Sequence, residues 1–93
     1  MGKTRIAPMR EAKLRQRIHI AGKIRHLRGK TDKNAANLEC EVTDGTGSLL
    51  LVFQGRRRIP GIAVGALLVA EGMVGSWSRR LAILNPDYEL VAD

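Results

Sequence analysis

Apolar and polar residues alternate along much of this chain with the two-residue period of half-buried β-strands. From Gln16 onward one side carries Ile18, Ile20, Gly22 and Ile24. The other side carries Arg17, His19, Lys23 and Arg25. The pattern predicts a strand with an apolar inner face and a cationic outer face, and Gly22 predicts a bend or bulge within it.

Two further strands are predicted before the middle of the chain. Residues 29–34 are polar enough to form a loop, and Leu38, Cys40 and Val42 then alternate with polar residues. The Asp-Gly-Thr-Gly turn at residues 44–47 leads into a third strand. In that strand we expect inward positions at Leu49, Leu51 and Phe53, and outward positions at Leu50, Val52 and Gln54.

The second half of the chain predicts two more strands. Residues 54–65 contain glycines, three arginines and a proline, so they predict a connection with at most one helical turn. Residues 67–74 are apolar enough for a strand buried on both faces, residues 75–80 predict a hairpin loop, and residues 81–84 predict a last strand ended by Pro86. Five short strands without a long amphipathic helix predict an all-β fold, a closed or partly open five-stranded barrel.

The chain length allows one small domain. Its 93 residues can bury a single core, which we expect to occupy residues 16–93. Residues 1–15 lack strand alternation, but good helix formers follow Pro8. This basic N-terminal arm is therefore expected to be either disordered or a short helix.

Positive charge is concentrated in the first third of the chain. The net charge is +7, and residues 1–33 hold 11 Lys and Arg against two acidic residues, whereas the remainder holds 5 basic and 7 acidic residues. This asymmetry favours a partner with a phosphate backbone. A solubilising tail, an anionic membrane and an acidic protein are the alternatives.

The residue types that support catalysis or metal binding are sparse. Cys40 is the only cysteine, which excludes an intrachain disulfide and a cysteine-rich zinc site, and His19 and His26 do not have a metal-ligand spacing. The carboxylates lack a convergent set of catalytic partners. No apolar run approaches the roughly 18–20 residues that span a bilayer. We therefore expect a non-catalytic, cytoplasmic protein without a cofactor, a metal or a membrane association.

The order of these elements resembles an OB fold, and more narrowly the wedge domain of RecG-type branched-DNA helicases. The resemblance covers about residues 16–91, and its matching residues are the turn at 42–47, Leu49, Leu51, Phe53, Gly65, Gly72, Gly75 and the ending Asn85-Pro86-Asp87-Tyr88-Glu89. It implies binding to single-stranded or branched DNA without catalysis. The wedge pattern has a second aromatic and an Asn where this chain has Gln54 and Gly55, so part of the family's stacking surface is missing. The chain also lacks the phosphate loop of a helicase motor, so ATP-driven unwinding is not implied.

Binding to a nucleic-acid strand requires cations along the backbone and flat faces for the bases. Trp77, in the predicted hairpin loop, is the candidate for stacking, and the alternative is that it packs as a lid on the barrel. Glu39 and Glu41 could neutralise part of the cationic strand through cross-strand ion pairs. The other predicted nucleic-acid-binding residues are Arg17, His19, Lys23, Arg25, Arg28, Lys30, Lys33, Gln54, Arg56, Arg57, Arg58, Arg79 and Arg80.

Two alternative functions remain open at this point. The outward apolar residues Leu50 and Val52 would also suit a protein–protein adaptor, with a partner in DNA repair or replication. An OB barrel would equally suit RNA or tRNA, because nothing in the sequence identifies a reader of the 2′-hydroxyl.

Overall fold

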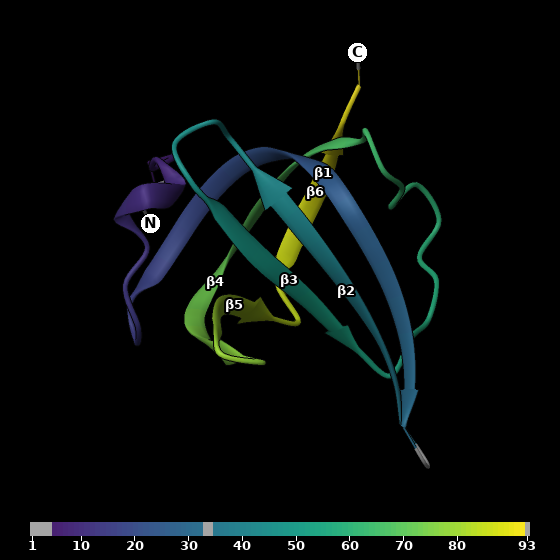
Figure 1. Cartoon of the computed structure of the whole chain (residues 1–93). Coiled ribbons are helices and arrows are strands. Elements are labelled where there is room, and N and C mark those ends of the chain that lie inside the picture. The colour runs from purple at the N-terminus through teal and green to yellow at the C-terminus, as the bar shows by residue number, and fades with distance from the viewer. Residues whose placement is uncertain (1–4, 33–34, 93) are drawn as a thin grey trace.

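The computed structural model describes residues 5–32 and 35–92, which fold almost entirely as β-strands (Figure 1). A single 3-10 turn, η1 (Met9–Glu11), precedes six strands. They are β1 (Arg17–Asp32), β2 (Ala35–Thr43), β3 (Ser48–Gln54), β4 (Leu67–Trp77), β5 (Arg80–Leu84) and β6 (Asp87–Val91). These residues contain no α-helix, and the predicted all-β class is confirmed.

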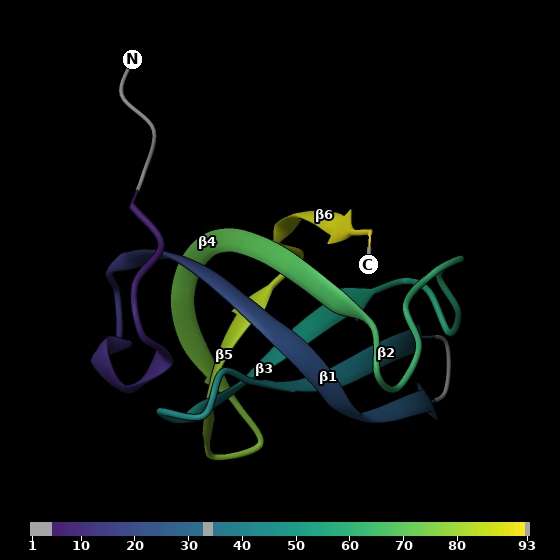
Figure 2. The same ribbon diagram turned by 90° about the horizontal axis from the view of Figure 1, so that it is seen from above.

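Five of the strands form a ring. Neighbouring strands pair in the order β1-β2-β3-β5-β4, and β4 pairs back to β1. The long strand β1 closes the ring because residues 17–23 pair with β4 and residues 23–32 pair with β2, as its curved path in Figures 1 and 2 shows. Every pair is antiparallel except β3 with β5, which is parallel.

The structure adds a sixth strand to the five that were predicted. The prediction that regular pairing stops at Pro86 was wrong, because the chain re-enters the sheet as β6 and pairs with β4 from Leu67↔Val91 to Glu71↔Asp87. A proline removes the backbone donor only at its own position. Pro86 lies between β5 and β6, where its missing N–H interrupts no pairing within a strand.

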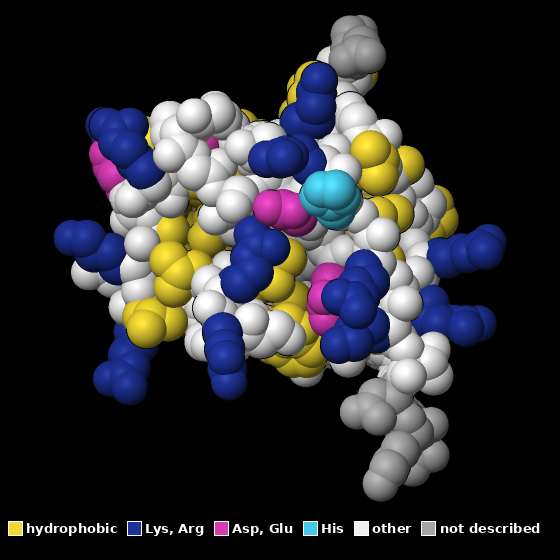
Figure 3. Space-filling model, in the orientation of Figure 1, with side chains coloured by type: hydrophobic (Ala, Val, Ile, Leu, Met, Phe, Trp, Pro, Cys, Tyr) yellow, Lys and Arg dark blue, Asp and Glu magenta, His cyan; other side chains and the backbone are white. Residues whose placement is uncertain are grey.

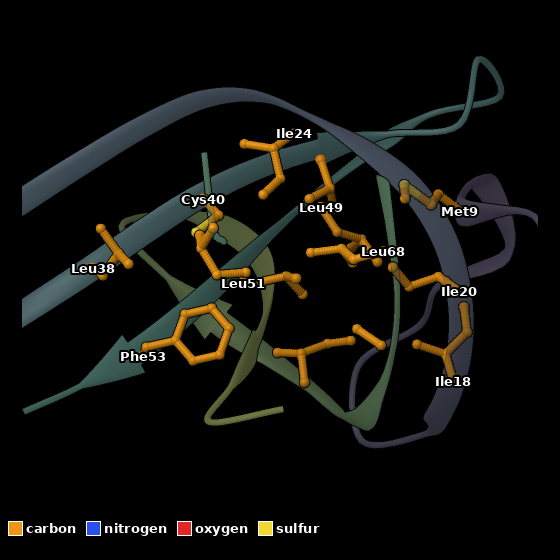
Figure 4. Close-up of a cluster of buried hydrophobic side chains, with 14 of the residues drawn as sticks. Met9, Ile18, Ile20, Ile24, Leu38, Cys40, Leu49, Leu51, Phe53 and Leu68 are labelled. Atoms are coloured by element: carbon orange, nitrogen blue, oxygen red, sulfur yellow. The ribbon is translucent and has the colours of Figure 1, made fainter. Parts of the chain in front are cut away.

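The core fills the inside of the ring (Figure 4). The inward positions predicted for the first three strands are buried except for half-buried Gly22, which confirms that part of the pattern. Phe53 packs edge to face on Tyr88, with ring centroids 5.4 Å apart. The fully buried side chains are Ile20, Ile24, Leu38, Cys40, Val42, Leu49, Leu51, Val52, Leu68, Val74 and Ile83.

The opposite face of β3 is also covered, contrary to the prediction that Leu50 and Val52 are exposed. Leu50 is 6% exposed and Val52 is fully buried. Together with Ala82 they form a second apolar cluster, here called the outer cluster, on which Trp77 and Leu84 pack. Alternation assigned these residues to the correct side of the strand, but it carried no information about what covers that side.

Strand β4 is half-buried rather than buried on both faces as predicted. Leu68, Ala70, Gly72 and Val74 are buried, whereas Val69 and Glu71 are partly exposed and Met73 is 50% exposed. An apolar run therefore marked this strand without showing that both of its faces are covered.

Both predicted hairpin loops are shorter than expected. β1 continues to Asp32 and β2 begins at Ala35, so most of the predicted loop at residues 29–34 is paired strand. β4 extends to Trp77 and β5 begins at Arg80. The turn between them consists only of Ser78 and Arg79, with φ of 50° and 66°, as in a type I′ turn.

Of the bend or bulge predicted at Gly22, the bulge lies elsewhere, because the register shift in β1 is between Ile24 and His26. The predicted bend agrees with the change of partner from β4 to β2 at Lys23, the next residue. Gly22 pairs regularly with Leu68. Its lack of a side chain is needed for close packing instead, because a Cβ there would lie 2.8 Å from the backbone oxygen of Thr43 and would also meet the side chain of Met9.

Residues 5–15 are packed against the ring. Of the two alternatives for the N-terminal arm, these described residues follow the short helical turn, and Met9 is 2% exposed within the core. The backbone N–H of Ala7 donates to the carbonyl of His19 at 2.8 Å, and the N–H of Arg15 donates to the carbonyl of Val74 at 2.8 Å. The segment thus covers an edge of β1 that β2 does not reach.

Candidate nucleic-acid interface

Trp77 lies at the end of β4 and reaches across the outer cluster to β2. Its indole Nε1–H donates a 2.8 Å hydrogen bond to Oε2 of Glu39, although β5 and β3 lie between the two strands. Glu39 is only 8% exposed. Trp77 itself is half-buried, so the structure shows the packed alternative for this side chain while leaving part of the indole at the surface.

Arg80 is held beside Trp77 because the two residues pair across the tight turn. Its guanidinium Nη2 donates to Oε2 of Glu41 and to the hydroxyl of Ser48, both at 3.1 Å. Glu41 also faces Nε2 of His26 at 3.9 Å. Of the two carboxylates expected to neutralise the cationic strand, Glu41 forms an ion pair with Arg80, and Glu39 accepts the hydrogen bond from Trp77.

The second half of β1 contributes cations to the same face. After the register shift, His26 is opposite Glu41 and Arg28 is opposite Glu39, so these side chains share the outer side of the sheet with Trp77. Lys30 follows two residues later with the same orientation and, like Arg28, is exposed. His26 was not among the predicted site residues, because its orientation depends on a shift that the alternation did not reveal.

We call this surface the Trp77 face. It consists of Trp77 with Arg28, Lys30, Arg79 and Arg80, and with His26, Glu39 and Glu41 between them. Lys33, which was predicted to belong to the site, lies outside the described residues.

The first half of β1 lies in more acidic surroundings. Arg17 Nη2 is 3.8 Å from Oε2 of Glu71, and half-buried His19 lines a depression with Glu71, Asp87 and Glu89. Lys23 and Arg25 are exposed further along the strand. The structure does not join this part of the predicted row to the Trp77 face, because β1 bends away from β4 after Lys23.

The remaining predicted residues lie at the end of β3 and directly after it. The side chain of Gln54 is engaged by Asn85, whose Nδ2 donates to its Oε1 at 2.9 Å, while the backbone N–H of Gln54 donates to Oδ1 of Asn85 at 2.9 Å. The three arginines Arg56, Arg57 and Arg58 are exposed on the β3–β4 connection. They form a separate basic cluster beside the β1–β2 hairpin, since Arg57 lies against Gly29.

Most of the positive charge faces solvent. Figure 3 shows Lys and Arg side chains spread over one face and its rim, with acidic side chains between some of them. Among the described side chains, Arg17 forms an ion pair with Glu71 and Arg80 forms one with Glu41. The other described cations keep their charge available for an anionic partner.

Other chemistry has little support in the described part of the chain. Cys40 is fully buried, and burial raises the pKa of its thiol to about 12, so the reactive thiolate is disfavoured. No group of three His, Cys, Asp or Glu side chains among the described residues could hold a metal ion. The same residues include no helix with the length and apolar character needed to cross a membrane.

Comparison of the chain with protein-family models and with curated proteins finds no match.

Proposed function

We propose that this protein is a non-catalytic OB-fold domain that binds single-stranded or branched DNA, mainly through the backbone and with weak sequence preference. The ring order β1-β2-β3-β5-β4, with β3 and β5 parallel, is compatible with a five-stranded OB barrel to which β6 has been added. OB folds bind oligonucleotides over strands 2 and 3 and the adjacent loops. The Trp77 face includes Glu39 and Glu41 of β2 and the residues at the β4–β5 turn.

The observation that carries the proposal is a fixed aromatic near exposed cations. Trp77 is held by Glu39 and by the outer cluster, so stacking a base on its exposed part would cost little additional side-chain freedom. Base–aromatic stacking contributes roughly 1–3 kcal/mol per base. Arg28, Lys30 and Arg79 are exposed on the same side and can contact the phosphates on either side of that base.

The acidic residues of β2 shape the expected affinity. Glu39 and Glu41 place negative charge beneath the surface that the strand would cross. Binding therefore depends on the surrounding cations and should weaken as salt screens them. Three or four neutralised phosphates predict a slope of about −2 to −3 in a plot of log affinity against log salt concentration for single strands.

The direct test is a titration of the single tryptophan's fluorescence with single-stranded, forked and duplex DNA at two salt concentrations. Parallel anisotropy measurements on labelled DNA report binding independently of Trp77. We expect quenching by single-stranded or forked DNA that weakens at higher salt. Absence of an anisotropy change with every DNA, or binding that is insensitive to salt, would contradict the proposal.

The type of nucleic acid is tested by competition. An RNA of the same sequence should displace labelled single-stranded DNA less effectively than unlabelled DNA does if the domain is a DNA-binding protein. Stronger displacement by RNA would instead favour the RNA- or tRNA-binding alternative. The adaptor alternative was based on exposed Leu50 and Val52, and both residues are covered in the structure.

A further inference from the structure

A groove of about 360 Å³ lies between the β1–β2 hairpin and the β3–β4 connection. Its floor is apolar and consists of Leu27, Leu38, Ile59, Pro60 and Ile62. Its rim carries two arginines, Arg57 and Arg58. The described residues that line it include no acidic or aromatic side chain, so an apolar floor and a cationic rim are combined in one concave site.

The groove is distinct from the Trp77 face. Leu38 and Glu39 are consecutive on β2 and point to opposite sides of the strand, Leu38 to the groove and Glu39 to Trp77. Leu27 likewise lines the groove, whereas its neighbour Arg28 is on the other side. A ligand could therefore occupy the groove while the Trp77 face is in use.

The floor and walls of the groove are built into the fold. Leu38, Ile59 and Ile62 belong to the core and are 2%, 7% and 5% exposed. The connection approaches the hairpin closely, because a Cβ at Gly29 would be 3.5 Å from the backbone oxygen of Arg57. Leu27 is 37% exposed, so its apolar side chain is accessible to a ligand in the groove.

The chemistry of the lining selects among anionic ligands. Unstacked bases are bound mainly on aromatic faces, and this lining has none. An aliphatic floor suits an apolar side chain, and guanidinium groups suit carboxylates, which they can bind through two parallel hydrogen bonds. Neither Arg57 nor Arg58 forms an ion pair with a carboxylate among the described residues, and the adjacent Arg56 adds positive charge.

We propose that this groove binds an acidic peptide segment of a partner protein. One or two aliphatic side chains of the peptide enter between Leu27 and Ile62, and flanking carboxylates pair with Arg57 and Arg58. The partner is identified by this charge complementarity, and the site would let a nucleic-acid-binding domain be recruited by a second protein. The inference is independent of what binds the Trp77 face.

The test uses the full chain and a fluorescein-labelled ten-residue peptide of alternating aspartate and glutamate with two central leucines. We expect saturable binding by anisotropy, and a loss of affinity of about tenfold or more in the double variant Arg57→Glu/Arg58→Glu. The matched control is Arg28→Glu/Arg79→Glu, which changes the net charge equally on the Trp77 face and should bind the peptide within about twofold of the wild type. Circular dichroism establishes that both variants are folded.

The apolar contribution is tested separately. Leu27→Ser, at a partly exposed position, and a peptide whose leucines are replaced by serine should each weaken binding by about threefold or more. The proposal would be overturned if both charge variants lost the same affinity for the peptide or if the serine changes had no effect. It would also be overturned if binding did not saturate up to about 1 mM peptide. If the binding of single-stranded DNA depends on Arg57 and Arg58 and the binding of the peptide does not, the groove is a nucleic-acid site. This result would also overturn the proposal. Loss of DNA binding with retained peptide binding would refute only the function proposed for the Trp77 face.

Discussion

The indole N–H of Trp77 and the carboxylate of Glu39 are joined by a 2.8 Å hydrogen bond that links the end of β4 to β2. The bond satisfies the polar atom of the indole while its ring packs on the outer cluster. It also gives the 8% exposed carboxylate of Glu39 a donor. One contact thus stabilises the fold and fixes the aromatic side chain at the proposed interface.

Removing the donor should destabilise the protein. Trp77→Phe retains an aromatic ring but leaves the carboxylate of Glu39 without the indole N–H. We expect the free energy of unfolding to fall by about 1–3 kcal/mol, the usual cost of leaving a buried polar group unsatisfied. Urea denaturation followed by circular dichroism measures this, since the variant has no tryptophan to report by fluorescence.

A substitution of the acceptor, Glu39, tests how its negative charge affects DNA binding separately from how the hydrogen bond affects stability. Glu39→Gln keeps an oxygen that can accept from Trp77 but removes a negative charge from the Trp77 face. It should unfold within about 1 kcal/mol of the wild type and bind single-stranded DNA more tightly at low salt, because phosphates no longer approach a carboxylate. Unchanged or weaker DNA binding by this folded variant would argue against a phosphate path beside Glu39.

Arg79 allows the charge of the hairpin to be removed without harming the turn. It has φ of 66°, a conformation that glycine adopts at no steric cost. Arg79→Gly should therefore leave the stability unchanged or raise it by up to about 1 kcal/mol. If Arg79 contacts a phosphate, the affinity of this variant should fall by a similar factor for every single-stranded sequence. The slope of log affinity against log salt concentration should then be less steep by about 1. Unaltered affinity and slope would exclude that contact.

Arg80 is a poorer probe, although it is next in the chain. Charge reversal there would break contacts with Glu41 and Ser48 and would place two carboxylates together. Weaker DNA binding by such a variant would not distinguish a lost phosphate contact from a disturbed surface. The comparison of Arg79→Gly with Arg79→Lys, which retains the positive charge, avoids this ambiguity.

The inward residues of the first three strands could be predicted because buried and exposed positions alternate along a half-buried strand. Leu38, Cys40 and Val42 alternate with polar neighbours, and the buried side of the strand follows directly. The same period could not show that Leu50 and Val52 are buried. Their covering comes from Trp77 and Leu84, which are more than twenty residues away in the chain.

The site was predictable in its residue types but not in its grouping. Trp77 and Arg79 stand out as an aromatic and a cation near a turn, and in the structure Trp77 ends β4 while Arg79 lies in the two-residue turn that follows. The separation of Arg17 from Arg28 depends on the register shift after Ile24 and on the change of partner from β4 to β2. Such changes result from ring closure, which local alternation does not encode.

The N-terminal segment should be needed for stability. Met9 is 2% exposed in the core, so Met9→Ala is expected to lower the free energy of unfolding by about 2–5 kcal/mol. Deletion of residues 1–13 should cost at least as much, because it removes Met9 together with the rest of η1. Deletion of residues 1–4 alone is the control, because it leaves Met9 and η1 in the chain. Cooperative, wild-type unfolding after the longer deletion would show that these contacts are dispensable.

Asp44 should make part of the stability depend on pH, because it ties the β2–β3 turn to η1. Its Oδ2 accepts from the backbone N–H of Met9 at 2.9 Å, and its Oδ1 accepts from the hydroxyl and N–H of Thr46 at 2.7 and 2.9 Å. Desolvation opposes ionisation, but these hydrogen bonds and one from the N–H of Gly47 outweigh it and lower the pKa of Asp44.

A lowered pKa in the folded state means that the ionised carboxylate stabilises the fold at pH values above its unfolded pKa of about 3.9. This contribution is lost as the pH falls through the lower folded pKa. Asp44→Asn should therefore be less stable than the wild type by about 1 kcal/mol near pH 7, and the difference should shrink below about pH 4. Urea denaturation of both proteins between about pH 2 and pH 7 measures it. Thr46→Ala removes the hydroxyl donor and should reduce the pH dependence without abolishing it, whereas a difference between wild type and Asp44→Asn that persists unchanged at low pH would show that the charge of Asp44 does not stabilise the fold.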